Sequence, residues 1–256
     1  MYLSRKNVSV RHCRNMEDKK KNIVCYARTE MLEGLFDSSY VWEFFSEDRK
    51  EKIHKFQKKN DKLRAFSAGL LLEYGLRQYG MTQSKPEVLS GRQTENNIRR
   101  VKIIYGVNGK PMIEGENKVY FNLSHSGNYV AAAFAGQEIG IDVERLQYGK
   151  QKIAEHFFSE EEKKFLRENW DDSLFTKIWT RKESYIKADG RGMGVKLDTF
   201  SVLSDCSLPF YFSSYSLQGK AWLSVCMKNE KPDMIPQEVD LKRFVETEVR
   251  NSCTMN

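Results

Sequence analysis

Apolar and polar positions along the chain predict two long helices, each with one buried side. Over about 173–189, apolar side chains recur every three or four residues, the spacing of an amphipathic helix, and the stretch at about 61–79 matches this helix. A shorter helical stretch precedes each one, at 44–56 and 157–169, and opens with Phe-Phe-Ser and acidic residues. Both serines suit an N-cap and the acidic side chains suit the first turn, while Ser159 and Glu162 have the spacing of a capping box.

The two helix pairs match when Phe44 is aligned with Phe157, so we interpret the chain as two similar halves. The same alignment places Phe66 on Trp179 and Leu70 on Glu183. The alternative is a chance similarity between two helix starts. If the halves are related, only the second keeps an acidic residue at this helix position.

Strand patterns alternate with the helices but do not follow a regular βαβ order. They occur at 100–105, 119–122, 129–135, 139–143, 199–203, 210–217 and 221–227, with turn residues such as Asn108-Gly109 between them. This mixture favours an α+β fold over a doubly wound sheet. We expect two similar α+β subdomains related by a pseudo-two-fold axis, 22–138 and 139–256. Each would be a small, mostly antiparallel sheet packed on a long helix.

The positive charge of the chain is concentrated at its start. The formal net charge is +7, and the segment 1–21 contributes +5 of it through seven basic and two acidic side chains. We expect this tail, 1–21, to be disordered. The remaining chain is nearly neutral, so its overall charge does not indicate nucleic-acid binding.

Cysteine usage and hydropathy indicate a cytoplasmic protein. The five cysteines are widely spaced and include no Cys-x-x-Cys, so they predict neither a zinc site nor a disulfide framework. A reducing cytosol fits this pattern best. No stretch has the length and apolar character of a membrane span, and the N-terminus has no signal-peptide pattern.

The helix over 173–189 carries charges where its apolar face should continue. Lys182 lies in the middle of an apolar stripe, Glu183 lies at the border, and Lys187 follows one turn later. A pattern violation of this kind is typical of a functional site. The alternatives are a lysine whose stem packs while its ammonium reaches water, and an ordinary surface ion pair between Glu183 and Lys187.

Two other segments place polar groups where chemistry could occur. In GIDVERL, 140–146, strand alternation puts Asp142 and Glu144 on the same face, where a cation would relieve their repulsion; a solvated edge screened by Arg145 is the alternative. FNLSHSG, 121–127, could cradle a phosphate or form a hydrogen-bonded turn. Ser124 and His125 are adjacent in an extended segment and point apart, so they make a poor nucleophile–base pair.

Basic residues are dense around the first helix pair. They are Arg49, Lys50, Lys52, Lys55, Lys58, Lys59, Lys62 and Arg64. Such a run is usually a solvated face, but Arg49 and Lys52 have the spacing to bind one phosphate together.

Together these segments resemble the 4′-phosphopantetheinyl transferases of the surfactin-synthetase (Sfp) type. The matching motifs are GKP at 109–111, NLSHSG at 122–127, GIDVE at 140–144 and WTRKESYIKADGRG at 179–192. The resemblance covers roughly 40–227. It implies an enzyme that transfers the phosphopantetheine arm of coenzyme A to a serine of an acyl or peptidyl carrier protein and releases adenosine 3′,5′-bisphosphate.

The resemblance also implies roles for particular residues. Asp142, Glu144 and Glu183 would bind Mg²⁺, or Mn²⁺ in its place, and Glu183 or a metal-bound hydroxide would accept the serine proton. Lys187 would neutralise the pyrophosphate. The remaining contacts to coenzyme A would come from Arg49, Lys52, Arg64, Lys110, Pro111, Ser124 and His125. The role of Lys182 would be structural or substrate-orienting. The first half would thus bind the nucleotide, and the second would hold the metal and catalytic residues.

Three functions compete at this point. A carrier-protein transferase would act as a monomer on an acidic partner, received near 145–160 in our interpretation, in fatty acid, polyketide or nonribosomal peptide synthesis. A non-catalytic coenzyme A or nucleotide-binding protein could share the scaffold, but the intact Asp142, Glu144, Glu183 and Lys187 argue against it. A nucleic-acid-binding protein is disfavoured by the near-neutral body and the lack of a recognisable module.

Overall fold

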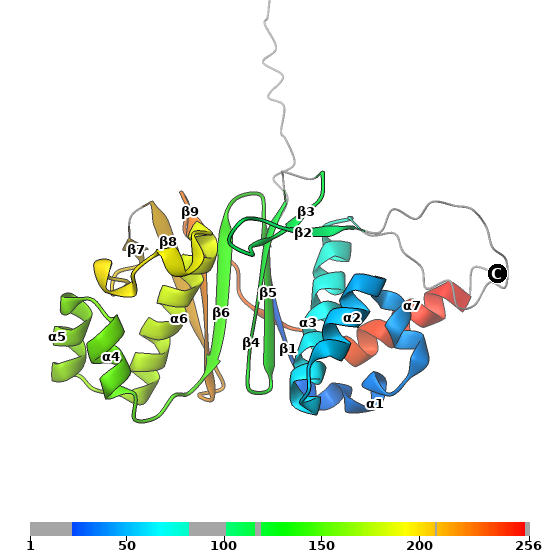
Figure 1. The fold of residues 1–256 in the computed structure, drawn as a ribbon, viewed down its shortest axis with the longest axis horizontal. Helices are drawn as coiled ribbons and strands as arrows, with labels where there is room; N and C mark the ends of the chain where they lie inside the picture. Colours follow the sequence, from blue (N-terminus) through cyan, green and yellow to red (C-terminus); the bar gives the residue numbers. More distant parts are fainter. Residues whose placement is uncertain (1–21, 82–100, 116–118, 208, 254–256) are drawn as a thin grey trace, which may run out of the picture.

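In the part of the chain that the structure describes, two four-stranded sheets pack face to face, each covered on its outer side by helices (Figure 1), and a third sheet has two strands. The computed structural model describes residues 22–81, 101–115, 119–207 and 209–253. The tail expected to be disordered, 1–21, lies outside these residues. Within the described part, no helix combines the length and apolar character needed to cross a membrane.

The first half contains the strand β1, the long helix α3 and the β-hairpin of β4 and β5, which faces the second half. Its elements are β1 (Ile23–Arg28), α1 (Glu33–Phe36), α2 (Glu47–Lys55), α3 (Lys59–Gln78), β2 (Ile103–Tyr105), β3 (Pro111–Ile113), β4 (Tyr120–Ser126) and β5 (Tyr129–Ala135), with 3₁₀ turns at Thr29–Leu32 and Ser39–Phe44. The sheet order is β10-β1-β5-β4, and β2 and β3 pair separately.

The second half repeats the plan of a sheet on a long helix. Its elements are β6 (Ile139–Arg145), α4 (Gln151–Phe157), α5 (Glu160–Glu168), α6 (Asp172–Asp189), β7 (Cys206–Ser207), β8 (Phe210–Leu217) and β9 (Ala221–Lys228), with 3₁₀ turns at Gly192–Gly194 and Leu197–Thr199. The sheet order is β6-β9-β8-β7, with all pairs antiparallel.

The two halves correspond in both their strands and their helices. The order β6-β9-β8 corresponds to β1-β5-β4. The interval from the start of α2 to the start of α5 equals the interval from the start of α3 to the start of α6. The expected α+β fold with two similar halves is confirmed.

Apolar clusters join the four layers of the molecule, which are helices, the first sheet, the second sheet and helices. One cluster joins α3 to the outer face of the first sheet, and a second joins α6 to the outer face of the other sheet. Between the sheets, the small residues Ala131, Ala133 and Ala135 of β5 pack against Ile141 and Val225, among other apolar residues. Small side chains on β5 allow the two sheets to approach closely. The two halves therefore share one interior.

The end of the chain corrects the expected domain boundary. We expected 139–256 to form the second half, but β10 (Gln237–Glu238) pairs in parallel with β1 of the first half. Helix α7 (Leu241–Cys253) then packs beside α3, where Leu241 and Val245 are buried in the first apolar cluster. This return occurs because the apolar face of α7 completes that cluster. Figure 1 shows α7 on the side of α1, α2 and α3.

Several predicted elements are confirmed, and one strand is wrong. Helices α3 and α6 begin and end close to the expected positions, and Ser159 and Glu162 form the complete capping box at the start of α5. Ser46 begins α2 without a capping hydrogen bond from its side chain. The strand expected at 199–203 is absent from this segment, which runs from a 3₁₀ turn into irregular chain.

Candidate active site at the seam between the halves

Strand β4 of the first half lies along the open edge of β6 and caps it with side chains. The backbone N–H groups of Ile141, Val143 and Arg145 donate to Asn122 Oδ1, Ser124 Oγ and Ser126 Oγ, at 3.1, 3.3 and 3.4 Å. Alternate residues on both strands take part, so the strands run in the same direction. Edge donors need partners when they are buried, and here polar side chains provide them in place of a neighbouring backbone.

Gly140 brings the other side of β6 against helix α6. A Cβ atom at this position would lie only 2.0 Å from the Ser184 carbonyl oxygen and 2.4 Å from the Ala188 nitrogen. Only glycine permits this approach. Asp142 and Glu144 follow on the same face of the strand, so the contact sets them beside the last turns of α6, which carry Glu183 and Lys187.

Asp142 is buried and tightly held. Its Oδ1 accepts hydrogen bonds from Ser124 Oγ and from Lys187 Nζ, both at 2.7 Å, and Lys187 also donates to Ser124 Oγ at 3.0 Å. Three elements, β4, β6 and α6, therefore meet at one carboxylate. The sequence-predicted residues Asp142, Ser124 and Lys187 are thus brought together by direct contacts.

Glu144 lies two residues after Asp142 on β6 and is held by similar contacts. Its Oε1 accepts a hydrogen bond from Ser126 Oγ and another, at 2.8 Å, from the side-chain amide of Gln147. Neither Ser126 nor Gln147 was a sequence-predicted site residue. Strand alternation from Ser124 could have indicated Ser126, whereas no pattern in the sequence indicates Gln147.

Glu183 lies half-buried near the other two carboxylates. Burial raises its pKa, and the negative charges of Asp142 and Glu144 raise it further, while Lys187 opposes them. The three acidic residues are therefore close enough to interact electrostatically. Across the described ranges, no group of three His, Cys, Asp or Glu side chains converges into a ready-made metal site.

His125 and Arg64 lie at the first-half side of this cluster. Arg64 donates to the Gly127 carbonyl oxygen at 3.3 Å and pairs with Asp61. Desolvation lowers the pKa of His125, and the positive charges of Arg64 and Lys187 lower it further. A lowered pKa favours the neutral imidazole, which has one N–H donor and one acceptor nitrogen.

Lys110 and Pro111 lie at the C-terminal end of α6. Lys110 Nζ donates to the Ala188 carbonyl oxygen at 2.7 Å, and the Asn108 amide donates to the Gly190 carbonyl oxygen at 3.1 Å. Both contacts satisfy carbonyl groups that a helix end leaves without partners. Burial lowers the pKa of Lys110. Pro111 begins β3 opposite Tyr105. The hairpin of β2 and β3 thus joins the first half to α6 of the second half. None of its described contacts involves Asp142, Glu144 or Glu183.

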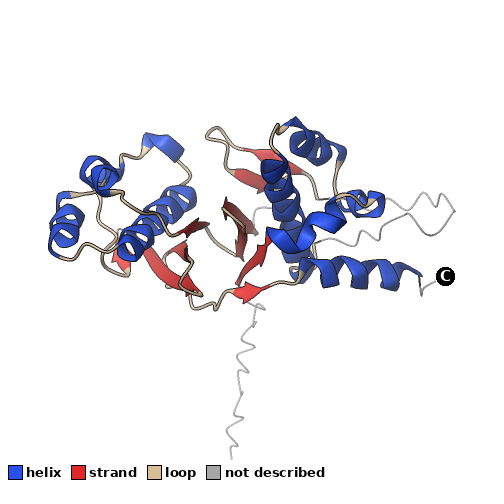
Figure 2. Ribbon diagram, turned by 90° about the horizontal axis from the view of Figure 1, so that it is seen from below, coloured by secondary structure: helices blue, strands red, loops and turns tan. Residues whose placement is uncertain are grey.

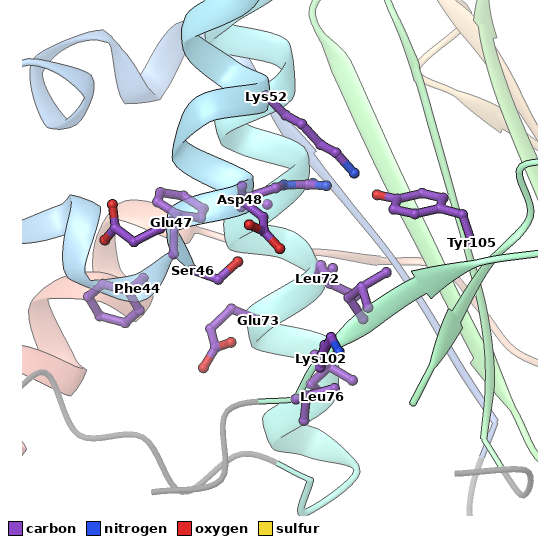
Figure 3. Close-up of a pocket in the computed structure, with 15 residues that line it drawn as sticks. Phe44, Ser46, Glu47, Asp48, Lys52, Leu72, Glu73, Leu76, Lys102 and Tyr105 are labelled. Atoms are coloured by element: carbon purple, nitrogen blue, oxygen red, sulfur yellow. The ribbon is translucent and has the colours of Figure 1, made fainter. Parts of the chain in front are cut away.

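Arg49 and Lys52 form a separate basic group at a cavity of about 410 Å³ between α2, α3 and β2 (Figure 3). Lys52 Nζ lies 3.8 Å from the centre of the Tyr105 ring, and Figure 3 shows the two side chains pointing toward each other. Among the described residues, the buried Arg49 Nε has no hydrogen-bond partner, and burial lowers the pKa of Arg49. The basic residues predicted to act together with Arg64 are therefore not joined to it by described contacts.

Lys182 has a structural environment. Its ammonium group is fully buried and uses all three donors, to Glu162 Oε2 at 2.7 Å and to the carbonyl oxygens of Leu197 and Phe200 at 2.6 and 2.7 Å. Its partner Glu162 also accepts from the backbone of Ser159 and Val202. The pattern violation at Lys182 therefore marks a buried ion pair that fixes α5 and the chain around 197–202 to α6.

Comparison with known proteins places this fold and seam in one class of enzymes. The sequence model of the 4′-phosphopantetheinyl transferase superfamily matches residues 138–232, which hold β6, α6 and their carboxylates. The 4′-phosphopantetheinyl transferase Sfp of Bacillus subtilis (strain 168) is 31% identical over 218 residues, covering 79% of this chain and 89% of the relative. The chain therefore belongs to the 4′-phosphopantetheinyl transferase superfamily and is of the Sfp type.

Other relatives carry the same activity in their names. The 4′-phosphopantetheinyl transferase ffp of Bacillus subtilis is 28% identical, covering 80% of this chain and 90% of the relative. The 4′-phosphopantetheinyl transferase gsp of Aneurinibacillus migulanus is 40% identical over 109 residues, which are 41% of this chain and 45% of the relative. The protein is thus an enzyme that transfers phosphopantetheine, as expected, and the alternative of a non-catalytic binding protein is set aside.

Proposed function

We propose that the protein moves 4′-phosphopantetheine from coenzyme A to a serine of an apo acyl or peptidyl carrier protein and releases adenosine 3′,5′-bisphosphate. The observation that supports this most strongly is the meeting of Asp142, Glu144, Glu183 and Lys187 at the seam. Such a cluster suits phosphoryl transfer, in which negative charge on phosphate oxygens must be stabilised.

The three carboxylates would hold a Mg²⁺ ion, with Mn²⁺ as a substitute. Within the described residues, the side-chain hydrogen bonds of Asp142 and Glu144 all go to one oxygen of each carboxylate, so the second oxygen accepts none. Mg²⁺ binds through a few carboxylates together with substrate phosphates and keeps several waters, so a closed protein cage is not required. When bound, it would neutralise charge on the pyrophosphate.

The side chains of the seam would carry out the transfer itself. The hydroxyl oxygen of the carrier serine attacks the β-phosphorus of coenzyme A, and the bond from this phosphorus to the oxygen of the departing adenosine 3′,5′-bisphosphate breaks. Glu183 accepts the serine proton, because its raised pKa makes it a stronger base than an exposed glutamate. Lys187 stabilises the charge that develops on the phosphate oxygens.

The nucleotide of coenzyme A would lie along the first half of the seam. His125 and Arg64 would bind its phosphate groups, with Arg49 and Lys52 further along and Lys110 and Pro111 beside the adenine. Ser124 is a weaker candidate for a phosphate contact. Its hydroxyl already donates to Asp142 and accepts from Val143 and Lys187, so a phosphate would have to replace Lys187.

The carrier protein would dock beside Glu144, on the segment 145–160. Two large apolar side chains are exposed there, Tyr148 at 70% and Phe157 at 41%. Exposed apolar groups next to a polar site are typical of a protein-binding surface. All the proposed catalytic groups come from one chain, so we propose that the enzyme acts as a monomer with one site.

Intact-mass spectrometry tests this proposal. Apo carrier proteins from fatty acid, polyketide and nonribosomal peptide synthesis are incubated separately with the enzyme, coenzyme A and Mg²⁺. We expect at least one carrier to gain the mass of a single phosphopantetheine arm, at a serine. Absence of this adduct on every carrier, with a known transferase modifying the same samples, would rule out the proposed reaction.

A further inference from the structure

Glu144 is fixed by two side chains, one from each half of the molecule. Ser126, from β4, donates its hydroxyl hydrogen to Glu144 Oε1, and Gln147 donates from its amide to the same oxygen. The side chain of Glu144 makes no other hydrogen bond within the described ranges. One carboxylate oxygen therefore carries two donors, while Oε2 carries none.

The same arrangement occurs at Asp142, two residues earlier on the strand. Asp142 Oδ1 takes one donor from β4, Ser124, and one from the second half, Lys187. In both cases the serine hydroxyl also accepts the backbone N–H of the residue that follows the acid. The repetition indicates that the contacts at Glu144 belong to the architecture of the seam, because an isolated surface contact would not follow the strand spacing.

Gln147 is itself held in place by the long helix. Its backbone N–H donates to Thr176 Oγ1 at 3.0 Å, and the buried Thr176 hydroxyl donates to the Asp172 carbonyl oxygen in the first turn of α6. The amide of Gln147 therefore starts from a fixed backbone position. A donor fixed in this way restricts rotation of the Glu144 carboxylate, which an exposed glutamine would not do.

We propose that Gln147 and Ser126 are positioning residues for the reaction, holding Glu144 Oε1 so that a single oxygen, Oε2, is available to a divalent cation. This inference rests on the proposed function, because it takes Glu144 as one of the cation-binding carboxylates. Groups that orient metal ligands typically change metal affinity by about 10–100-fold when they are removed.

The test measures Mn²⁺ binding to the full-length protein by electron paramagnetic resonance, in the presence of saturating coenzyme A. We expect Ser126→Ala and Gln147→Met each to weaken Mn²⁺ binding about tenfold or more. Ser126→Thr keeps the hydroxyl and should bind Mn²⁺ as the wild type does. Gln151→Met, at an exposed glutamine that begins α4, is the matched control and should have no effect.

Coenzyme A binding without metal should be the same in all these variants, because the positioning acts on the cation alone. Wild-type Mn²⁺ affinity in both Ser126→Ala and Gln147→Met would overturn the inference. Equal losses in Ser126→Ala and Ser126→Thr would overturn it as well, since the hydroxyl would then not be the active group. A wild-type protein that binds no Mn²⁺ with coenzyme A present would instead contradict the proposed cation site, and the positioning role with it.

Discussion

Glu183 is a half-buried carboxylate that faces two other acidic residues, an arrangement that suits binding of a cation and destabilises the protein without one. Folding raises the pKa of Glu183 through burial and through the charges of Asp142 and Glu144. The folded protein therefore favours the protonated side chain, and this contribution to stability is fully present below the usual glutamate pKa of 4.5. It is lost as the pH rises through the raised pKa and the side chain ionises.

Glu183→Gln should therefore stabilise the metal-free protein at neutral pH while abolishing transfer. Each kcal/mol gained in the free energy of unfolding should raise the Tm by about 2–4 °C for a chain of this size. Thermal unfolding of both proteins as a function of pH provides the measurement. The difference should disappear below about pH 4, where the wild-type side chain is also neutral. A variant less stable than wild type at neutral pH would contradict this view of Glu183.

Lys182 should be essential for stability, because its loss leaves Glu162 charged and buried. We expect Lys182→Met to reduce the free energy of unfolding by about 3–5 kcal/mol in urea denaturation. The double variant with Glu162→Gln removes the unpaired charge and should be more stable than Lys182→Met alone. If the double variant is the less stable of the two, the ion pair is not the reason for the burial of Lys182.

Replacement of Arg64 tests the proposed position of the 3′-phosphate of coenzyme A. Arg64→Ala should weaken coenzyme A binding about tenfold or more, the usual range for loss of a charged hydrogen bond. Binding of the form without the 3′-phosphate should change little. Isothermal titration calorimetry with both ligands gives the comparison, with Lys59→Ala at the exposed start of α3 as the control. Equal losses for the two ligands would place the 3′-phosphate elsewhere.

The sequence indicated candidate site residues, but it did not indicate which residues they contact. Charged residues on an apolar stripe and paired carboxylates on a strand indicated Lys182, Glu183, Asp142 and Glu144. The three carboxylates lie near one another at the seam, whereas Lys182 contacts α5 and the chain around 197–202. The role of Lys182 could not be predicted, because its partner Glu162 lies on another helix. Gln147 could not be predicted either, because its importance depends on where Thr176 and Glu144 meet in space.

At the scale of elements, the contact between β6 and α6 sets the geometry of the site. Gly140→Ala would place a methyl group against the backbone of Ser184 and Ala188, so strand or helix must shift. We expect a loss of about 1–3 kcal/mol in the free energy of unfolding, together with impaired transfer. Gly34→Ala is the matched control, since no atom lies within 4 Å of its added Cβ. It should be neutral or slightly stabilising. Full activity and stability in Gly140→Ala would contradict the role given to this contact.

Elements that form because of patterns in their own residues could be predicted. Elements that depend on contacts with residues distant in the sequence could not. The capping box at Ser159 and the amphipathic stripes of α3 and α6 are local features. The segment 199–203 has strand-like residues, but its backbone bonds to buried side chains: the Phe200 carbonyl accepts from Lys182, the Val202 N–H donates to Glu162, and the Val202 carbonyl accepts from Arg181. These bonds replace a neighbouring strand, so no strand forms.

At the scale of the whole molecule, the two halves repeat one plan of a sheet on a long helix, and we propose that they divide the chemistry between them. The constant offset between the two helix pairs predicted this organisation, and α3 and α6 occupy corresponding places on their sheets in the view from below (Figure 2). The return of α7 to the first half was not predictable, because its apolar face would suit either half. The chain thus crosses the seam twice, after β5 and before β10.

The proposed reaction requires the carboxylates at this seam. Intact-mass spectrometry of an apo carrier protein, after incubation with coenzyme A and Mg²⁺, should detect one added phosphopantetheine with the wild type and none with Asp142→Ala. The matched control is Glu138→Ala, which removes an acid at the start of the same strand that pairs with Lys228. It should retain transfer. Circular dichroism should show that both variants are folded, and wild-type transfer rates from folded Asp142→Ala would contradict the account.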